Sequence, residues 1–148
     1  YLQNNGEVEK YYQALVKGKF ETNEFFIEDK IAISSDGIKR EIREDGQEAK
    51  TRVKVVDYFE DIDVSLVELK LYTGRTHQIR VHLSAKGHPI LGDTLYGGEF
   101  PGVERQFLHS YKIKYIDPKT KKKQCFVIDL ADDMKKFLRK SEKKNQTN

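Results

Sequence analysis

The densest group of side chains able to do chemistry lies in residues 73–82, which read Thr-Gly-Arg-Thr-His-Gln-Ile-Arg-Val-His. Arg75 and Arg80 carry planar, permanently charged guanidinium groups, which bind a carboxylate or a phosphate through paired hydrogen bonds. Gly74 has no side chain, so it lets a ligand approach the backbone closely. The segment therefore predicts a site for an anionic group.

Two other kinds of catalytic site find little support. His77 and His82 are five residues apart, which misses the spacing of a helical zinc pair, and His88 and His109 add no motif. The single cysteine, Cys125, cannot build a multi-cysteine metal site. No serine is flanked by glycines as in a nucleophile elbow. We therefore predict no metal site and no serine nucleophile.

Composition limits the class of protein further. The 148 residues fit one domain with a core of its own, and a third of them (34%) are charged. No apolar run approaches the roughly 18 residues that span a bilayer, and no secretory leader pattern is present. Cys125 has no partner for an internal disulfide and is predicted to be an inert core or edge residue. We expect a cytoplasmic protein with no membrane partner.

Basic residues gather in two places, although the net charge is only +3. Such clusters can hold phosphates without sequence specificity. They can equally be the solvated tip of a hairpin and a solvated C-terminal tail, and both interpretations stay open. The clusters are Lys119, Lys121, Lys122 and Lys123, and then Lys135, Lys136, Arg139, Lys140, Lys143 and Lys144.

Apolar alternation predicts several strands and few helices. Acidic residues 60–63 and Asp117-Pro118 are typical of hairpin turns. An α+β domain around a largely antiparallel sheet follows. The predicted strands are 8–16, 51–59, 64–72, 108–116 and 124–130, with a shorter extended segment at 25–33; residues 34–48 and 92–102 are predicted loops, and 132–144 a helix with Met134, Phe137 and Leu138 on one face.

Residues 76–86 fit two structures. Their apolar side chains alternate, which favours a strand. Ile79 and Leu83 are also one helical turn apart, which favours a helix. Thr73 or Thr76 can cap its N-terminus, and Gly87 suits its C-terminus. Periodicity leaves both alternatives open.

Three segments together resemble a known family. Residues 74–97, GRTHQIRVHLSAKGHPILGDTLYG, resemble the signature of the ribosomal large-subunit branch of the pseudouridine synthases. Residues 10–18, KYYQALVKG, are similar to its Lys-x-Tyr-x-Ala-x-Val-x-Gly strand, and Leu108-His109 to its Leu-His-Ala segment. The resemblance implies the pseudouridine synthase catalytic fold, with 76–86 as a helix.

The resemblance also implies a reaction. Enzymes of this family flip a uridine out of RNA, detach its base at N1 and rejoin it through C5, with an essential aspartate and no cofactor. By position, Tyr12 corresponds to the tyrosine that packs against the flipped base, and Arg80 to the arginine that pairs with the aspartate. The expected partner is RNA, rRNA first and tRNA second. We expect substrate or RNA binding from Lys10, Arg75, Thr76, His77, Gln78, Ile79 and Leu83.

Structural roles compete at some of these positions. A tyrosine on a sheet, such as Tyr12, usually serves packing, and Arg75 can simply order its loop. Asp93 is expected to cap a loop, and Gly97-Gly98 to form a turn. The histidines can satisfy buried backbone groups.

The family's catalytic aspartate lies in a His-Arg-Leu-Asp stretch before the Tyr12 strand, and no aspartate of this chain follows Arg-Leu. We therefore expect residues 1–148 to be the C-terminal part of one catalytic domain, with about 135–148 as a basic helix or tail, and to be inactive alone. The alternative is a non-catalytic RNA-binding module derived from this fold. Exposed strand edges also suggest self-association, including a domain-swapped dimer.

Overall fold

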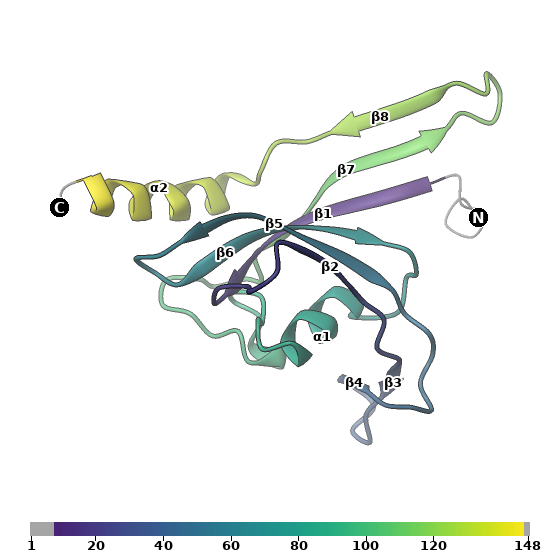
Figure 1. Cartoon of the computed structure of the whole chain (residues 1–148), viewed down its shortest axis with the longest axis horizontal. Helices are drawn as coiled ribbons and strands as arrows, with labels where there is room; N and C mark the ends of the chain where they lie inside the picture. Colours follow the sequence, from purple (N-terminus) through teal and green to yellow (C-terminus); the bar gives the residue numbers. More distant parts are fainter. Residues whose placement is uncertain (1–7, 147–148) are drawn as a thin grey trace.

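The computed structural model describes residues 8–146, with side chains for 8–140. A six-stranded antiparallel sheet of order β2-β5-β6-β1-β7-β8 carries helix α1 on one face and α2 on the other (Figure 1). The predicted α+β class is confirmed. The elements are β1 Val8–Lys17, β2 Glu24–Ile27, β3 Ile31–Ile33, β4 Arg40–Ile42, β5 Thr51–Phe59, β6 Val64–Leu71, α1 Gln78–Ala85, the 3-10 turn η2 Thr94–Tyr96, β7 Leu108–Ile116, β8 Lys123–Val127 and α2 Asp132–Gln146.

Strand β1 is paired at both edges, with β6 and β7, and in its second half both of its faces are packed against cores. Successive side chains of a strand point to opposite faces. Ala14 and Val16 therefore join the core under α1, while Leu15 joins the core under α2. This explains why the strand reads as an almost continuous apolar run there.

A β-bulge interrupts the pairing of β1 with β7. Tyr11 is opposite Lys112 and Tyr12 is opposite Ser110, so Tyr111 is the extra residue. A bulge turns two consecutive side chains toward the same face and increases the local twist. As a result Tyr111 and Lys112 both lie over the α2 side of the sheet, where each contacts a residue of β1 or β6.

Residues 78–85 are a helix, which resolves the ambiguity of segment 76–86 in favour of the family resemblance. Ile79 and Leu83, one turn apart, are buried against the sheet. The helix ends as predicted, with Gly87 at φ 86° after Lys86. The predicted threonine cap is wrong: the N-cap is His77, at φ 57°, with no side-chain cap bond.

Three segments depart from the predicted layout. The extended segment 25–33 breaks into β2 and β3. The predicted loop 34–48 contains β4, which pairs with β3 as a separate two-stranded sheet, and the predicted loop 92–102 contains η2. Three-residue elements carry too few apolar residues for a periodic signal, so sequence patterning misses them.

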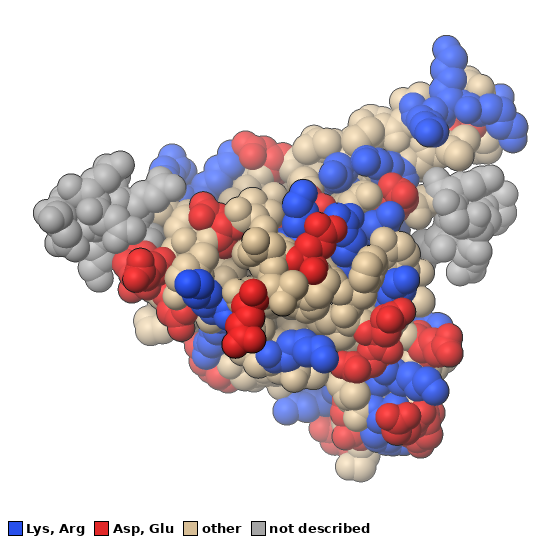
Figure 2. Space-filling view, in the orientation of Figure 1, with Lys and Arg blue, Asp and Glu red and all other residues tan. Residues whose placement is uncertain are grey.

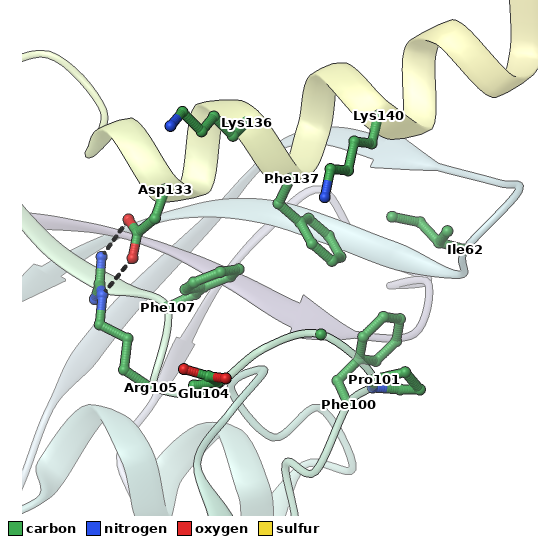
Figure 3. Close-up of a pocket in the computed structure, with 11 residues that line it drawn as sticks. Ile62, Phe100, Pro101, Glu104, Arg105, Phe107, Asp133, Lys136, Phe137 and Lys140 are labelled. Carbon is green, nitrogen blue, oxygen red and sulfur yellow. Dashed lines mark hydrogen bonds and ion pairs between the residues drawn. The ribbon is translucent and has the colours of Figure 1, made fainter.

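Helix α2 closes the second core. Met134 is fully buried, and Phe137 meets Phe100 and Phe107 edge to face, with ring centroids 5.7 and 5.5 Å apart. Arg105 clasps Asp133 through two hydrogen bonds of 2.7 Å (Figure 3). The predicted apolar face of this helix is confirmed. Lys143 and Lys144 of the predicted basic tail lie outside the described side chains.

Cys125 lies exposed on β8, an edge strand. This fits the edge alternative predicted for it. Among residues 8–146, neither helix is long and apolar enough to cross a bilayer.

Candidate active site

Tyr12 lines a hollow of about 700 Å³ at the start of β1 and the end of β6. Lys10 and Arg75, two of the predicted binding residues, line the same hollow. Its remaining walls are Val8, Glu9, Lys70, Leu71, Tyr72, Thr73 and Gly74. Half-buried Tyr12 packs against the core under α1, so its ring is held from behind while one side faces the hollow.

The loop between β6 and α1 is held by Gln78. Its amide oxygen accepts hydrogen bonds from the Thr73 hydroxyl (2.7 Å) and the Arg75 N–H (3.0 Å). Its amide nitrogen donates to the Lys50 carbonyl and the Thr51 hydroxyl. Gln78 is buried, and its amide already accepts two hydrogen bonds and donates two. It therefore shapes the wall of the hollow rather than offering a free amide to a ligand.

Arg80 forms a paired interaction with Asp93. Its Nε and Nη2 donate to the two carboxylate oxygens at 2.8 and 2.9 Å. The Asp93 side chain is 1% exposed and that of Arg80 17%. The hydrogen bonds with Asp93 raise the pKa of Arg80 above its usual value. Nη1 makes no hydrogen bond within the described residues, so it remains available for a second anion.

Tyr96 joins the Arg80 pair to the start of α1. Its ring lies 5.1 Å below the Arg80 guanidinium. Its hydroxyl accepts from the Arg40 N–H (2.8 Å) and meets His77 Nδ1 (2.8 Å). If the hydroxyl donates its proton to Nδ1, His77 is neutral with its own proton on Nε2. Burial and the nearby Arg80 and Arg40 charges lower the pKa of His77, in agreement.

Two glycines let the loop carrying Asp93 close on itself. A side chain at Gly92 would place Cβ 2.0 Å from the Arg105 carbonyl oxygen, and one at Gly98 would place it 1.8 Å from the Ile90 carbonyl oxygen. Such contacts are far shorter than van der Waals distance. The tight loop brings the Asp93 carboxylate to Arg80, so the carboxylate makes no cap bond to η2, contrary to the expected capping role.

His82 sits fully buried behind the site. Its Nε2 donates to the Asp29 carbonyl at 2.9 Å, and its Nδ1 accepts from the Thr51 hydroxyl at 2.9 Å. Burial lowers its pKa, although the bond to Asp29 opposes this. His88 similarly meets the Lys17 carbonyl at 2.8 Å. Both serve the backbone, as the structural interpretation predicted.

The structure thus sorts the predicted residues into two groups. Tyr12, Lys10 and Arg75 share the hollow. Arg80 does not line it; with His77 it belongs to a cluster around Asp93 and Tyr96. Thr76 is exposed, and Ile79 and Leu83 lie in the core, where they can act on the site only by packing.

Asp93 and Tyr96 are the functional candidates that the residue patterns missed. Their only signal in the sequence is the loop Gly-Asp-Thr-Leu-Tyr-Gly, whose glycines suggested a simple turn. Within residues 8–146, no three His, Cys, Asp or Glu side chains come together as a metal site would require.

The comparisons with known proteins agree with this fold. Residues 1–85 match the family model described as RNA pseudouridylate synthase. The chain is 41% identical over 138 residues to an uncharacterised RNA pseudouridine synthase of Bacillus subtilis (strain 168), covering 93% of this chain and 48% of that protein. It is 34% identical to a ribosomal large subunit pseudouridine synthase C of Haemophilus influenzae, covering 90% of this chain and 44% of that protein.

Solved structures extend the likeness to three dimensions. The human RNA pseudouridylate synthase domain-containing protein 1 superposes with a TM-score of 0.70 at 27% identity, over 90% of this chain and 66% of that one. The chain belongs to the RNA pseudouridine synthase family. It spans about half the length of the curated relatives it matches.

Proposed function

We propose that this chain forms the part of an RNA pseudouridine synthase that binds the flipped uridine and positions a catalytic aspartate supplied by another segment. We also propose that the complete enzyme isomerises uridine in rRNA. The observation that carries the proposal is the Tyr12 hollow, which is lined by two aromatic and three cationic side chains. An unstacked base is held by aromatic packing and its phosphates by Lys or Arg.

Arg80 is proposed to pair with the catalytic aspartate through Nη1, the nitrogen that Asp93 leaves free. An adjacent cation keeps a carboxylate ionised. Asp93 would fix the guanidinium so that little ordering is needed when the aspartate arrives. The ribosomal large subunit synthases among the relatives favour rRNA as the substrate class.

The reaction tests this directly. We expect no pseudouridine from the 148-residue chain on an rRNA fragment, and turnover once a segment carrying the His-Arg-Leu-Asp stretch is added in cis or in trans. In the completed enzyme, Tyr12→Ala and Arg80→Ala should each abolish turnover. Turnover by the chain alone would contradict the proposed absence of the aspartate.

A matched control separates chemistry from folding. Tyr58→Ala removes another half-buried tyrosine, which pairs with Ser65 at the start of β6, whereas the hollow lies at the end of that strand; the variant should leave turnover intact. If completion restores no turnover while RNA still binds, the non-catalytic RNA-binding function becomes the better assignment.

A further inference from the structure

The sheet face that carries α2 is only half covered. Helix α2 packs over Leu15, Val64 and Leu66 at one end of the strands. Toward the other end, no helix within residues 8–146 covers the face, and its side chains are largely cationic and aromatic. We name this half the basic sheet face; it comprises Lys50, Arg52, Lys70, Lys112 and Lys114 with Phe26, Tyr72 and Tyr11.

Strand register makes these residues neighbours. Arg52 is opposite Lys70, Lys70 is opposite Tyr11, and Tyr11 is opposite Lys112. One row of side chains therefore crosses β5, β6, β1 and β7 at the strand spacing of about 4.8 Å. Figure 2 shows Lys and Arg side chains gathered over β1 and β7 and again at the tip of the β7–β8 hairpin, with some acidic side chains between them.

Three ammonium groups crowd one buried ring. Lys70, Lys112 and Lys114 lie 5.7, 4.2 and 5.5 Å from the ring centroid of Tyr11, which is 6% exposed. Two carboxylates lie beside this group: Glu9 pairs with Lys70 at 3.2 Å, and Glu68 accepts a hydrogen bond from the Tyr111 hydroxyl. In the described part of the chain, Lys112 and Lys114 form no ion pair. A bound anion would reduce the repulsion between these ammonium groups.

The outer part of the face is different in character. Arg52 pairs with Glu24, and Lys50 is 3.8 Å from Glu28. Between them, Phe26 and Tyr72 stand 50% and 44% exposed, with ring centroids 6.0 Å apart. Exposed rings beside cationic side chains are the combination that binds single-stranded nucleic acid, because bases stack on the rings while phosphates meet the cations.

We propose that the basic sheet face is a second RNA-binding surface, on which phosphates of single-stranded RNA contact Lys112 and Lys114 and bases stack on Tyr72. It adjoins the Tyr12 hollow, since Lys70, Tyr72 and Glu9 line that hollow too. An RNA strand whose uridine enters the hollow thus continues onto this face. The inference takes the identity of the polymer from the proposed function.

Fluorescence anisotropy with the 148-residue chain and a labelled single-stranded RNA of about 12 nucleotides tests the surface. The double variant Lys112→Gln, Lys114→Gln removes both charges and keeps part of each aliphatic stem, so the fold should persist. We expect about ten-fold weaker binding and a salt dependence shallower by about 1.4 in log–log slope, the value for two lost phosphate contacts. Tyr72→Ala should also weaken binding about ten-fold.

A control with an equal charge change is Lys119→Gln, Lys122→Gln at the exposed hairpin tip. A loss there as large as in the Lys112, Lys114 variant means that binding follows net charge alone, and overturns the proposal. Equal affinity for an acidic peptide of the same length overturns it as well. Uridine isomerisation is measured separately in the completed enzyme. If RNA binding depends on Lys112 and Lys114 but no turnover is seen, only the proposed function is contradicted.

Discussion

At the residue scale, Asp93 holds Arg80 in place and is nearly inaccessible to water. Asp93→Asn would leave the guanidinium partly buried without its counter-charge. Breaking such a pair costs about 3 kcal/mol in the free energy of unfolding. Urea denaturation followed by circular dichroism measures this change.

The control for Asp93 is Asp45→Asn, which disturbs an exposed pair with Arg43. Exposed ion pairs contribute little because water screens them, so we expect no measurable change there. Equal effects in the two variants would mean that burial of the Arg80 pair is energetically unimportant.

At the scale of the element, α1 depends on two neutral histidines, His77 before it and His82 within it. Burial lowers the pKa of both histidines in the folded state below the ordinary value of about 6.5, so the unfolded chain binds more protons near that pH. Stability is therefore complete above pH 6.5 and decreases as the pH falls below it. We expect the midpoint of urea unfolding to drop between pH 7.5 and 5.5.

The variant His82→Gln tests how much of the pH dependence of stability comes from His82. Glutamine can still donate to the Asp29 carbonyl and accept from Thr51, but it does not titrate in this range. The variant should be less stable at pH 7.5 and show a flatter pH profile below 6.5. An unchanged profile would assign the dependence to other groups.

Helix α2 allows two kinds of contact to be weighed. Met134→Ala removes a fully buried side chain, which costs about 3 kcal/mol. Asp133→Asn weakens the clasp with Arg105, whose partners are about half exposed, and costs only about 0.5 kcal/mol after screening. Thermal unfolding of both variants tests the conclusion that packing, not the ion pair, holds this helix; a larger loss in Asp133→Asn would reverse it.

At the scale of the whole molecule, β8 is an open edge of the sheet. Phe126, Val127 and Ile128 at its end are 56%, 64% and 62% exposed. Unpaired strand edges with apolar side chains favour association between copies. We expect reversible self-association at high protein concentration in light scattering, reduced by Phe126→Lys; a strictly monomeric chain at all concentrations would contradict this.

Much of the molecule was decided by local sequence. The alternation in residues 51–59 and 64–72 predicted β5 and β6, and the apolar stripe of residues 132–144 predicted α2, because side-chain periodicity follows from backbone geometry. The segments 74–97 and 10–18 carried the family resemblance, and with it Tyr12 and Arg80 as candidate site residues. The predictions of β5, β6 and α2 are confirmed, because each of these elements has a long periodic run; Tyr12 and Arg80 remain predictions from the resemblance.

The tertiary structure alone decided how these residues meet. Asp93 pairs with Arg80 because two glycines let one loop fold tightly, which no periodic pattern records. The basic sheet face exists because strand register aligns residues from β5, β6, β1 and β7. Residue types and local periods are properties of the sequence, whereas a pairing between distant residues depends on packing of the whole chain.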